Sequence, residues 1–546
     1  MSSADKSLDV ILAELGGFGK YQKRNFALIC IAVIYTAIHL NYVFTARDLN
    51  YRCKVEECDT NLEHFNPLWL AYAVPLENGR PVKCEKFKYA ANTSQTANTS
   101  QTPICSASAF DKNETESCDS FIYETSEKTI VNDFDIHCND NLWKLTMVGT
   151  INNIGHFFCL PFAGFVSDRY GRRTLLVGGL VLSAMAGLAR SFAPSYLWFL
   201  LLEFLDTFFG SGSFSCAFIL GVELVGPTRR VLIGTIISCA FTLGESLLGL
   251  IAWYAQSWRL FLRIVYPPGF LILFYLWLTP ESIRWLLAKG KTDDAVYILR
   301  KAATVNGKTI SPNALEKLSV KEEKDTTETQ SYPILRVLKS FAIMVRLISC
   351  SFCWICVTFL FYGLSLNSVA LSGNIYLNFI MTSLIEIPAF FATYIMMDRI
   401  GRRSSQFLSF IMTGCACFAF MCIPEEKAIL KLSAYLIGKF GASIAFTVLY
   451  VFTSELFPTS LRHSLLAMCS MLGRVGSMVA PQIPILAQVW HHLPVVLFGS
   501  MATAAGFLSL TFPETLNTKL PDTIEEAEAI GTIKIAKEKD LKPNCV

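Results

Sequence analysis

The chain has 546 residues, of which 52% are hydrophobic and only 17% are charged. Soluble globular proteins carry about 25% charged residues, so this composition argues against a soluble domain. The net charge of +3 is too small to suggest a nucleic-acid partner, and the basic residues gather at the ends of apolar segments. The sequence therefore predicts an integral membrane protein whose partner is the lipid bilayer.

The amino-terminal segment, 1–25, is predicted to be cytoplasmic. Apolar residues recur in it at helical spacing, at Leu8, Ile11, Leu12 and Leu15. We expect a surface helix that lies among the lipid headgroups. The apolar run that follows, 26–44, comes after a basic segment and has no small-residue cleavage site. This pattern favours a first membrane span over a signal peptide.

A long polar segment, 46–141, separates the first apolar run from the second. It holds every N-x-Ser/Thr sequon, at Asn92, Asn98 and Asn113, and six of the 18 cysteines, at Cys53, Cys58, Cys84, Cys105, Cys118 and Cys138. An even number of cysteines together with all the sequons in one polar segment predicts a glycosylated, disulfide-bonded loop in an oxidising compartment. A zinc site is the alternative, but the segment has no C-x-x-C pair, and six cysteines leave 15 pairings open. A tandem repeat at 91–96 and 97–102 is typical of a solvated arm.

Eleven further apolar runs follow the loop, each about 20 residues long, which is enough to cross roughly 30 Å of hydrocarbon as a helix. With 26–44 they predict twelve spans: 144–166, 174–193, 196–222, 231–254, 260–279, 343–365, 373–397, 404–423, 431–454, 464–488 and 493–512. The expected organisation is a first half at 26–279, a cytoplasmic linker of short helices at 280–342, a second half at 343–512 and a cytoplasmic tail at 513–546.

Arginines mark one side of the predicted membrane region. They fall in the turns on the same side as both termini: Arg169, Arg172, Arg173, Arg229, Arg230, Arg399, Arg402, Arg403 and Arg462. The positive-inside rule makes that side cytoplasmic and puts 46–141 outside. The expected location is the plasma membrane, with both termini in the cytoplasm.

Three motifs occur twice, in the same order and about 230 residues apart. The turn at Asp168–Arg173 returns at Asp398–Arg403, Glu223 returns as Glu455, and the dipeptide Pro280-Glu281 returns as Pro513-Glu514. A repeat at one offset across so many residues indicates an internal duplication. We expect two homologous six-helix halves.

Twelve spans, parallel halves and a repeated G-x-x-x-D-R-x-G-R-R turn resemble the major facilitator superfamily. The large loop after the first span, and the segments Pro280–Leu286, Glu455–Pro458 and Pro513–Asp522, resemble more narrowly its organic cation, anion and carnitine transporter family. The resemblance implies an all-α polytopic membrane protein with the major facilitator fold. It also implies a secondary-active or facilitative carrier that works by alternating access.

The resemblance further implies that the repeated turns form a cytoplasmic gate, which holds the halves together when the carrier faces outward. The gate residues are Asp168, Arg169, Arg172, Arg173, Glu223, Glu281, Asp398, Arg399, Arg402, Arg403, Glu455, Arg462 and Glu514. The alternative is that the arginines only set the topology, although this leaves the repeated acids unexplained. Tyr394 replaces the leading glycine in the second copy, so we expect looser packing there.

Polar and ionisable residues fall near the middle of several predicted spans: Asn152, Asn153, His156, Glu203, Asp206, Glu245, Glu386, Lys439 and Arg474. A charge at the bilayer centre costs roughly 2.5–3.5 kcal/mol on the insertion scale. Several such charges therefore imply a water-filled cavity or mutual pairing. His39 and Asn41 lie nearer the outer end of the first span, and Arg259 and Arg263 are expected to snorkel.

Two of these residues point to the charge of the substrate. Arg474 and Lys439 match positions where the anion and carnitine transporters of the resembled family carry basic residues. Glu203 and Asp206 share a helix face at i, i+3 spacing and could bind an ammonium group. We therefore expect an anionic or zwitterionic, carnitine-like organic ion. The alternatives are an organic cation, and an internal ion-pair network that needs no ligand.

Aromatic residues complete the predicted substrate site. Tyr362 lies in a segment that resembles one lining the substrate path in the family, and Phe446 is expected on an inner face. Such rings hold apolar bodies and, through cation–π contact, ammonium heads. The expected substrate-binding residues are thus Arg474, Lys439, Glu203, Asp206, Glu386, Tyr362 and Phe446.

Enzyme classes find no support in the sequence. Gly307-Lys308-Thr309 lacks the earlier glycine of a phosphate-binding loop, and no HExxH or GxSxG motif occurs. We expect no enzymatic activity, no cofactor and no metal site. The coupling ion is left open between Na⁺, protons and an exchanged solute. A receptor or scaffold without transport is the alternative from another class.

The loop prediction can be tested on the expressed protein. Glycosidase treatment should raise its gel mobility, and replacement of Asn92, Asn98 and Asn113 by Gln should abolish that shift. Thiol labelling from outside should find the six loop cysteines blocked until a reductant is added. Six freely labelled cysteines would contradict an oxidised loop.

Overall fold

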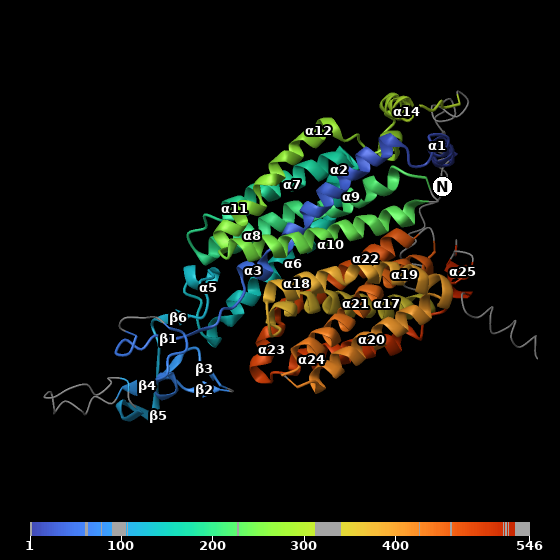
Figure 1. Ribbon diagram of the computed structural model, residues 1–546. Helices are drawn as coiled ribbons and strands as arrows, with labels where there is room; N and C mark the ends of the chain where they lie inside the picture. The colour runs from blue at the N-terminus through green and yellow to red at the C-terminus, as the bar shows by residue number, and fades with distance from the viewer. Residues whose placement is uncertain are drawn as a thin grey trace, which may run out of the picture.

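The computed structural model describes residues 3–59, 64–77, 79–89, 105, 107–226, 229–311, 340–424, 426–458, 461–516, 518, 521 and 524–529. Figure 1 shows long helices that run side by side, with a small strand-containing region at one end. We call that end, which carries residues 46–141, the loop end. The opposite end carries the two repeated turns, and we call it the turn end.

The first half contains six membrane crossings. Three of them are broken by short irregular or 3₁₀ segments. The crossings are α2 (Lys20–Thr36) with η1 (Ala37–Leu40) and α3 (Tyr42–Thr45), α6 (Leu142–Tyr170), α7 (Arg172–Arg190), α8 (Tyr196–Gly210) with α9 (Gly212–Glu223), α10 (Arg230–Ala255), and α11 (Trp258–Val265) with η5 (Pro267–Phe274) and α12 (Tyr275–Leu278).

The second half repeats this order. Its crossings are α17 (Phe341–Asn367) with η6 (Ser368–Ala370), α18 (Ile375–Leu384) with α19 (Glu386–Ile400), α20 (Arg402–Cys422), α21 (Ala428–Leu456), α22 (Arg462–Val479) with η7 (Ala480–Gln482) and α23 (Ile483–Val489), and α24 (Leu493–Ser509). Within the described chain, ten helical segments are long and apolar enough to cross a membrane. The more polar α6 and the shorter α24 complete the twelve.

Each half buries its own apolar core. The largest cluster joins α17, α21, α22 and α24 of the second half around Trp354, Phe452 and Phe498. Two clusters fill the first half, and one of them takes in Tyr376 and Phe379 from α18. The halves meet where α10 packs on α18 and α19, and where α6 packs on α22 and η7. Figure 1 shows the blue-to-green half and the yellow-to-red half lying side by side.

The described residues between 51 and 141 form a small region at the loop end. Three two-stranded antiparallel sheets pair β1 (Tyr51–Cys53) with β6 (Phe121–Tyr123), β2 (Leu76–Glu77) with β3 (Arg80–Pro81), and β4 (Glu85–Tyr89) with β5 (Phe110–Ser117). Short helices accompany them: α4 (Leu70–Ala73), η2 (Ala107–Ala109), α5 (Ile130–Asp133) and η3 (Asn139–Asn141).

The six predicted cysteines form three disulfides. They pair Cys53 with Cys118, Cys58 with Cys105, and Cys84 with Cys138. The structure thus selects one of the pairings that the sequence left open. Asn113 is exposed on β5, while Asn92, Asn98 and the tandem repeat at 91–102 lie outside the described residues.

The expectation that the apolar face of the amino-terminal helix lies among lipid headgroups was wrong. The helix α1 (Ser3–Glu14) does not present its apolar face to lipid headgroups, because Leu8, Ile11, Leu12 and Leu15 are buried in a separate cluster. That cluster also contains residues of α13 (Ile283–Ala288) and α14 (Thr292–Asn306), which follow the first half. Asp9 makes ion pairs with Arg230 (3.0 Å) and Arg284 (2.6 Å). An amphipathic stripe shows that a face is covered, and here protein covers it.

Candidate functional site: the paired gates and the buried charge networks

The two repeated turns have the same geometry at their glycines. Gly171 and Gly401 have φ values of +105° and +88° with extended ψ, a backbone region that is essentially restricted to glycine. Glu281 approaches the first turn so closely that an added Cβ on Gly171 would lie 2.2 Å from its carboxylate. The corresponding distance from Gly401 to Glu514 is 2.5 Å. Each turn therefore needs glycine for both its conformation and its contact.

The carboxylates of Glu281 and Glu514 accept hydrogen bonds from the first backbone amides of the helix that follows each turn. Glu281 accepts from Arg172 (2.9 Å) and Arg173 (3.1 Å). Glu514 accepts from Arg402 (2.8 Å) and Arg403 (3.0 Å). A carboxylate at a helix N-terminus satisfies unpaired amides and meets the positive end of the helix dipole. The turns are thus anchored by the same chemistry in both halves.

The other repeated acids, Glu223 and Glu455, also make corresponding contacts in the two halves. Glu223 accepts a short hydrogen bond from Ser282, and Glu455 accepts one of 2.6 Å from Thr515. Glu455 also pairs with Arg402 at 3.1 Å, whereas Arg172 pairs with Asp168 at 3.0 Å. All these contacts stay within one half.

Several gate residues leave their charged groups unpaired by acids in this conformation. Arg169 lies over the ring of Tyr170, and Arg173 donates to backbone carbonyls. Among the described residues no ion pair is formed by the side chains of Asp398, Arg399, Arg403 and Arg462. At the turn end, the second half therefore carries charged side chains that form no ion pair among the described residues.

The halves are joined to each other at the loop end. Thr146 and Thr150 on α6 exchange hydrogen bonds with Gln482 (2.9 and 2.6 Å), and Thr150 donates to the carbonyl of Met478 (3.1 Å). At the turn end, no hydrogen bond or ion pair between described gate residues crosses from one half to the other. This is a conformation closed at the loop end, with the two gate clusters separate.

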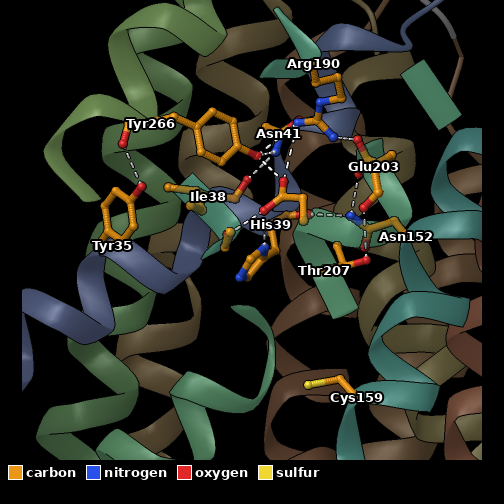
Figure 2. A network of polar contacts seen from close by, with 12 residues as sticks. Tyr35, Ile38, His39, Asn41, Asn152, Cys159, Arg190, Glu203, Thr207 and Tyr266 are labelled. Atoms are coloured by element: carbon orange, nitrogen blue, oxygen red, sulfur yellow. Dashed lines mark hydrogen bonds and ion pairs between the residues drawn. The ribbon is translucent and has the colours of Figure 1, made fainter. Parts of the chain in front are cut away.

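A buried polar network occupies the middle of the first half. Arg190 at the end of α7 forms an ion pair with Glu203 and lies 3.6 Å from Asp206, and all three side chains are fully buried. Arg190 also donates to Asn41 (2.7 Å) and to the Tyr266 hydroxyl (2.9 Å). Figure 2 shows these groups converging from several helices. Glu203 and Asp206 are thus paired with groups of the protein itself. This agrees with the alternative prediction of an internal ion-pair network that needs no ligand.

The sequence analysis did not identify Arg190. It lies near the end of the predicted span 174–193, where an arginine is typical of a snorkelling side chain. Glu203 and Asp206, at i, i+3 spacing, could have indicated a buried basic partner, because two carboxylates in one membrane span require a cation. Which arginine supplies it depends on how α7 and α8 pack.

A second buried network lies where the halves meet. Lys439 on α21 is fully buried and pairs with Glu386 on α19 at 2.8 Å. Its ammonium also donates to Ser365 (2.7 Å) and lies 3.4 Å from the centre of the Phe361 ring. Glu245 on α10 of the first half is buried within electrostatic reach of both charges. This network therefore holds two carboxylates and one ammonium.

Arg474 differs from the other midplane charges. It is half-buried on α22, and its guanidinium donates to the Tyr362 hydroxyl at 3.3 Å. No carboxylate among the described residues forms an ion pair with it. Phe446 lies beside Phe361, 5.1 Å between ring centres. The structure thus brings Arg474 to Tyr362, and Lys439 to Glu386, but it places Glu203 and Asp206 in a separate network.

Comparisons with known proteins agree with this architecture. The Major Facilitator Superfamily sequence profile matches residues 129–481. The structure is similar to the partially occluded, inward-open xylose transporter XylE from E. coli, with a TM-score of 0.59, 17% identity, and 92% and 100% of the two chains covered. The chain is therefore a membrane transporter with the major facilitator fold, as predicted.

Sequence relatives narrow the class. Solute carrier family 22 member 3 from Mus musculus is 30% identical and covers 97% of both chains. The organic cation transporter protein from Drosophila melanogaster is 31% identical, covering 96% of this chain and 95% of the relative. The chain belongs to the Major Facilitator Superfamily and, within it, to the organic cation transporter family, solute carrier family 22.

The glycine geometry gives a direct test of the turns. Gly171→Ala should lower the free energy of unfolding by about 1–3 kcal/mol, because a Cβ enters a glycine-only conformation and meets Glu281. Gly164→Ala is the matched control, since it lies on α6 in the same motif with no atom near an added Cβ. Thermal unfolding of the purified protein should show a lower midpoint for Gly171→Ala only. Equal midpoints would contradict the assigned role of Gly171.

Proposed function

We propose that the chain carries small organic cations across the plasma membrane by alternating access. The observation that supports this most is the network of Glu245, Glu386 and Lys439 at the junction of the halves. Two buried carboxyl groups face one ammonium there, so ionisation of both would leave the site short of one positive charge. A substrate ammonium supplies that charge. Relatives named as organic cation transporters support the same substrate class.

The surroundings of this network suit an organic ion. The rings of Phe361, Phe446 and Trp354 lie next to one another, and Tyr362 packs against Phe361. Aromatic faces attract ammonium groups and bury apolar substituents. The cation would contact α10 of the first half and α19 of the second. Binding would thereby stabilise a state in which these helices lie close together.

A zwitterion is a second candidate, and one observation favours it. Arg474 is a half-buried guanidinium that has a phenol but no carboxylate as partner among the described residues. Arginine binds a carboxylate through two parallel hydrogen bonds. A substrate with both an ammonium and a carboxylate would place the first at Glu386 and the second at Arg474. Glu203 and Asp206 are not needed in this arrangement, because Arg190 already neutralises part of their charge.

We also propose an orientation. The disulfide-bonded loop end would be extracellular and the arginine-rich turn end cytoplasmic. The conformation described above would then be closed outside, with the gate clusters of the two halves apart inside. During the change to an outward-facing state, the free charges of Asp398, Arg399, Arg403 and Arg462 would approach the acids and arginines of the first half. We expect the gate to work by an exchange of ion-pair partners, in which charged gate residues leave partners in their own half and pair with residues of the other half.

The substrate assignment is tested by uptake of a labelled tetraalkylammonium cation, a monocarboxylate and a betaine-type zwitterion. Glu386→Gln should raise the apparent KM for the cation roughly tenfold or more, because a charge-assisted contact is lost. The exposed Glu426, changed to Gln, is the matched control and should leave uptake unchanged. Arg474→Ala should impair only zwitterion uptake. Cation uptake by Glu386→Gln equal to the wild type would contradict the cation site.

The role of the gate is tested by measuring the maximal uptake rate alongside the apparent KM for the substrate. Asp168→Asn should lower the maximal uptake rate without changing the apparent KM, because Asp168 lies at the turn end and pairs with Arg172. Asp398→Asn should act similarly but more mildly, since Tyr394 replaces the leading glycine in the second turn. Both variants need normal amounts at the cell surface. An effect on KM alone would assign these residues to substrate recognition instead.

A further inference from the structure

Exposed basic side chains gather at the turn end, around the short connection between α1 and α2. Lys20, Lys23 and Arg24 lie in the first turns of α2 and are exposed. Arg229 directly precedes α10 and Lys308 follows α14, and both are exposed as well. We call these five residues the basic patch. They come from three parts of the chain that are far apart in the sequence, so only the fold brings them together.

Two glycines bring Arg229 and Lys308 to the same place. Gly16 and Gly17, which follow α1, have φ values of +89° and +68°, a conformation that glycine adopts without strain. A Cβ added to Gly17 would lie 3.7 Å from Nε of Arg229, and one added to Gly16 would lie 3.9 Å from Cε of Lys308. Arg229 and Lys308 therefore flank the connection that leads into Lys20. Figure 1 shows α1 and α14 together at this end of the molecule.

Asn306 joins the end of α14 to the start of α2. Its Oδ1 accepts a hydrogen bond from the backbone amide of Tyr21 at 2.9 Å. Its Nδ2 donates to the carbonyl of Leu15 (3.1 Å) and to Oε1 of Gln22 (2.8 Å). One side chain thus holds the end of α1, the first turn of α2 and the end of α14 together. The backbone positions of the neighbouring basic residues are therefore set by the fold.

The basic patch is not neutralised by acids of the described chain. Within the described ranges, none of its five side chains forms an ion pair with a carboxylate. Two acids of α1 are engaged by other groups. Asp9 pairs with Arg230 and Arg284, and Glu14 accepts a hydrogen bond from the hydroxyl of Ser311 at 2.8 Å. The patch therefore presents five positive charges to an anion.

The basic patch lies at the boundary of the membrane. Two of the helices that carry it begin membrane-crossing segments, Lys20–Thr45 and Arg230–Ala255. Along α10, exposed apolar side chains recur at helical spacing, at Leu232, Ile236, Leu243, Leu247 and Leu250. Such a stripe along a membrane helix is a face for lipid acyl chains, and Arg229 lies about one turn before its first residue. An acyl chain on this stripe would bring its headgroup to the patch.

The corresponding part of the second half is built differently. In the repeat, Leu461 stands at the place of Arg229. The start of α17 contacts the carboxyl-terminal helix α25 (Ile524–Ala529), because Ser340 donates to Glu528 and Arg346 donates to the carbonyl of Ala527. An acidic helix of the chain itself therefore lies against the second half there. A basic patch left exposed in one half only points to a role beyond setting the topology.

We propose that the basic patch binds the headgroup of a phosphoinositide, an anionic lipid whose inositol ring carries phosphate groups. Phosphate oxygens are strong acceptors for arginine and lysine, and clusters of basic residues on the cytoplasmic side of membrane helices attract such lipids. The acyl chains would lie along the exposed stripe of α10. The inference goes beyond the proposed substrate, and it rests on the proposed orientation because anionic lipids belong to the cytoplasmic leaflet.

Native mass spectrometry of the full-length protein in detergent tests the patch. The probes are short-chain phosphatidylinositol bisphosphate, short-chain phosphatidylserine and soluble inositol trisphosphate. We expect the phosphoinositide to bind most tightly, because phosphatidylserine carries less charge and the soluble headgroup has no acyl chains to bury. Changing Lys20, Arg229 and Lys308 together to Gln should weaken phosphoinositide binding about 100-fold, since each basic side chain contributes roughly a factor of five.

The matched control changes Lys289, Arg300 and Lys301 together to Gln, which removes the same charge from other exposed positions at or near α13 and α14. It should bind the phosphoinositide like the wild type. Equal weakening by both triple variants, or equal wild-type affinity for phosphatidylserine, would overturn the patch as a phosphoinositide site. Equal affinity for inositol trisphosphate would overturn the lipid assignment. All substituted side chains are exposed, so thermal midpoints should be unchanged, and binding needs no transport, so its failure is distinct from failure of the proposed function.

Discussion

The need to neutralise buried charge dominates this structure. A membrane interior offers no water to solvate an ion, so each intramembrane charge needs a partner or a solvated cavity. Arg190, Glu203 and Asp206 satisfy much of that need inside the first half, and Lys439 with Glu386 does so at the junction. Both networks keep one carboxylate more than they have cations. A transporter can use such a deficit, because a substrate or ion that fills it is stabilised without any change of fold.

The repeated turns of the two halves are stabilised by the same contacts. Glu281 and Glu514 each hold the first amides of the next helix, and Gly171 and Gly401 let them approach. Contacts between the halves are different in kind, since those at the loop end are neutral hydrogen bonds of threonine and glutamine. Neutral hydrogen bonds contribute about 1 kcal/mol each, so they can be exchanged during a conformational cycle. Charge-assisted bonds hold the turns within each half, whereas neutral ones join the halves at the loop end, and this difference favours rocking motion.

Two peripheral regions are fixed to this core. Three disulfides constrain the loop region, which has too few apolar residues for a large core of its own. At the turn end, α1 packs on α13 and α14, and Asp9 ties it to Arg230 at the start of α10. Because α10 also carries Glu245, the amino-terminal helix is mechanically connected to a helix of the proposed substrate site.

The membrane spans, the two halves, the disulfide-bonded loop and the family could be predicted from the sequence, because each depends on local sequence patterns. Apolar runs of about 20 residues gave the twelve crossings, and the repeat of Asp168–Arg173 at Asp398–Arg403 gave the two halves. Six cysteines and all the sequons in the polar segment 46–141 indicated the disulfide-bonded loop, although not its pairings. Family membership followed from motifs such as Pro280–Leu286 and is confirmed by the relatives.

Tertiary packing decided which charges meet. A shift of one residue turns a helical side chain by about 100°, so sequence spacing could put Glu203 and Asp206 on one face but could not say what that face touches. Arg190 reaches them from α7, Thr242 of the first half donates to Glu386 of the second, and His39 reaches Asp206 across the bundle. The apolar stripe of α1 was likewise visible, but protein rather than lipid covers it. Sequence determined that these groups need partners, because desolvation is a property of each residue; packing chose the partners, because contact is a property of the whole fold.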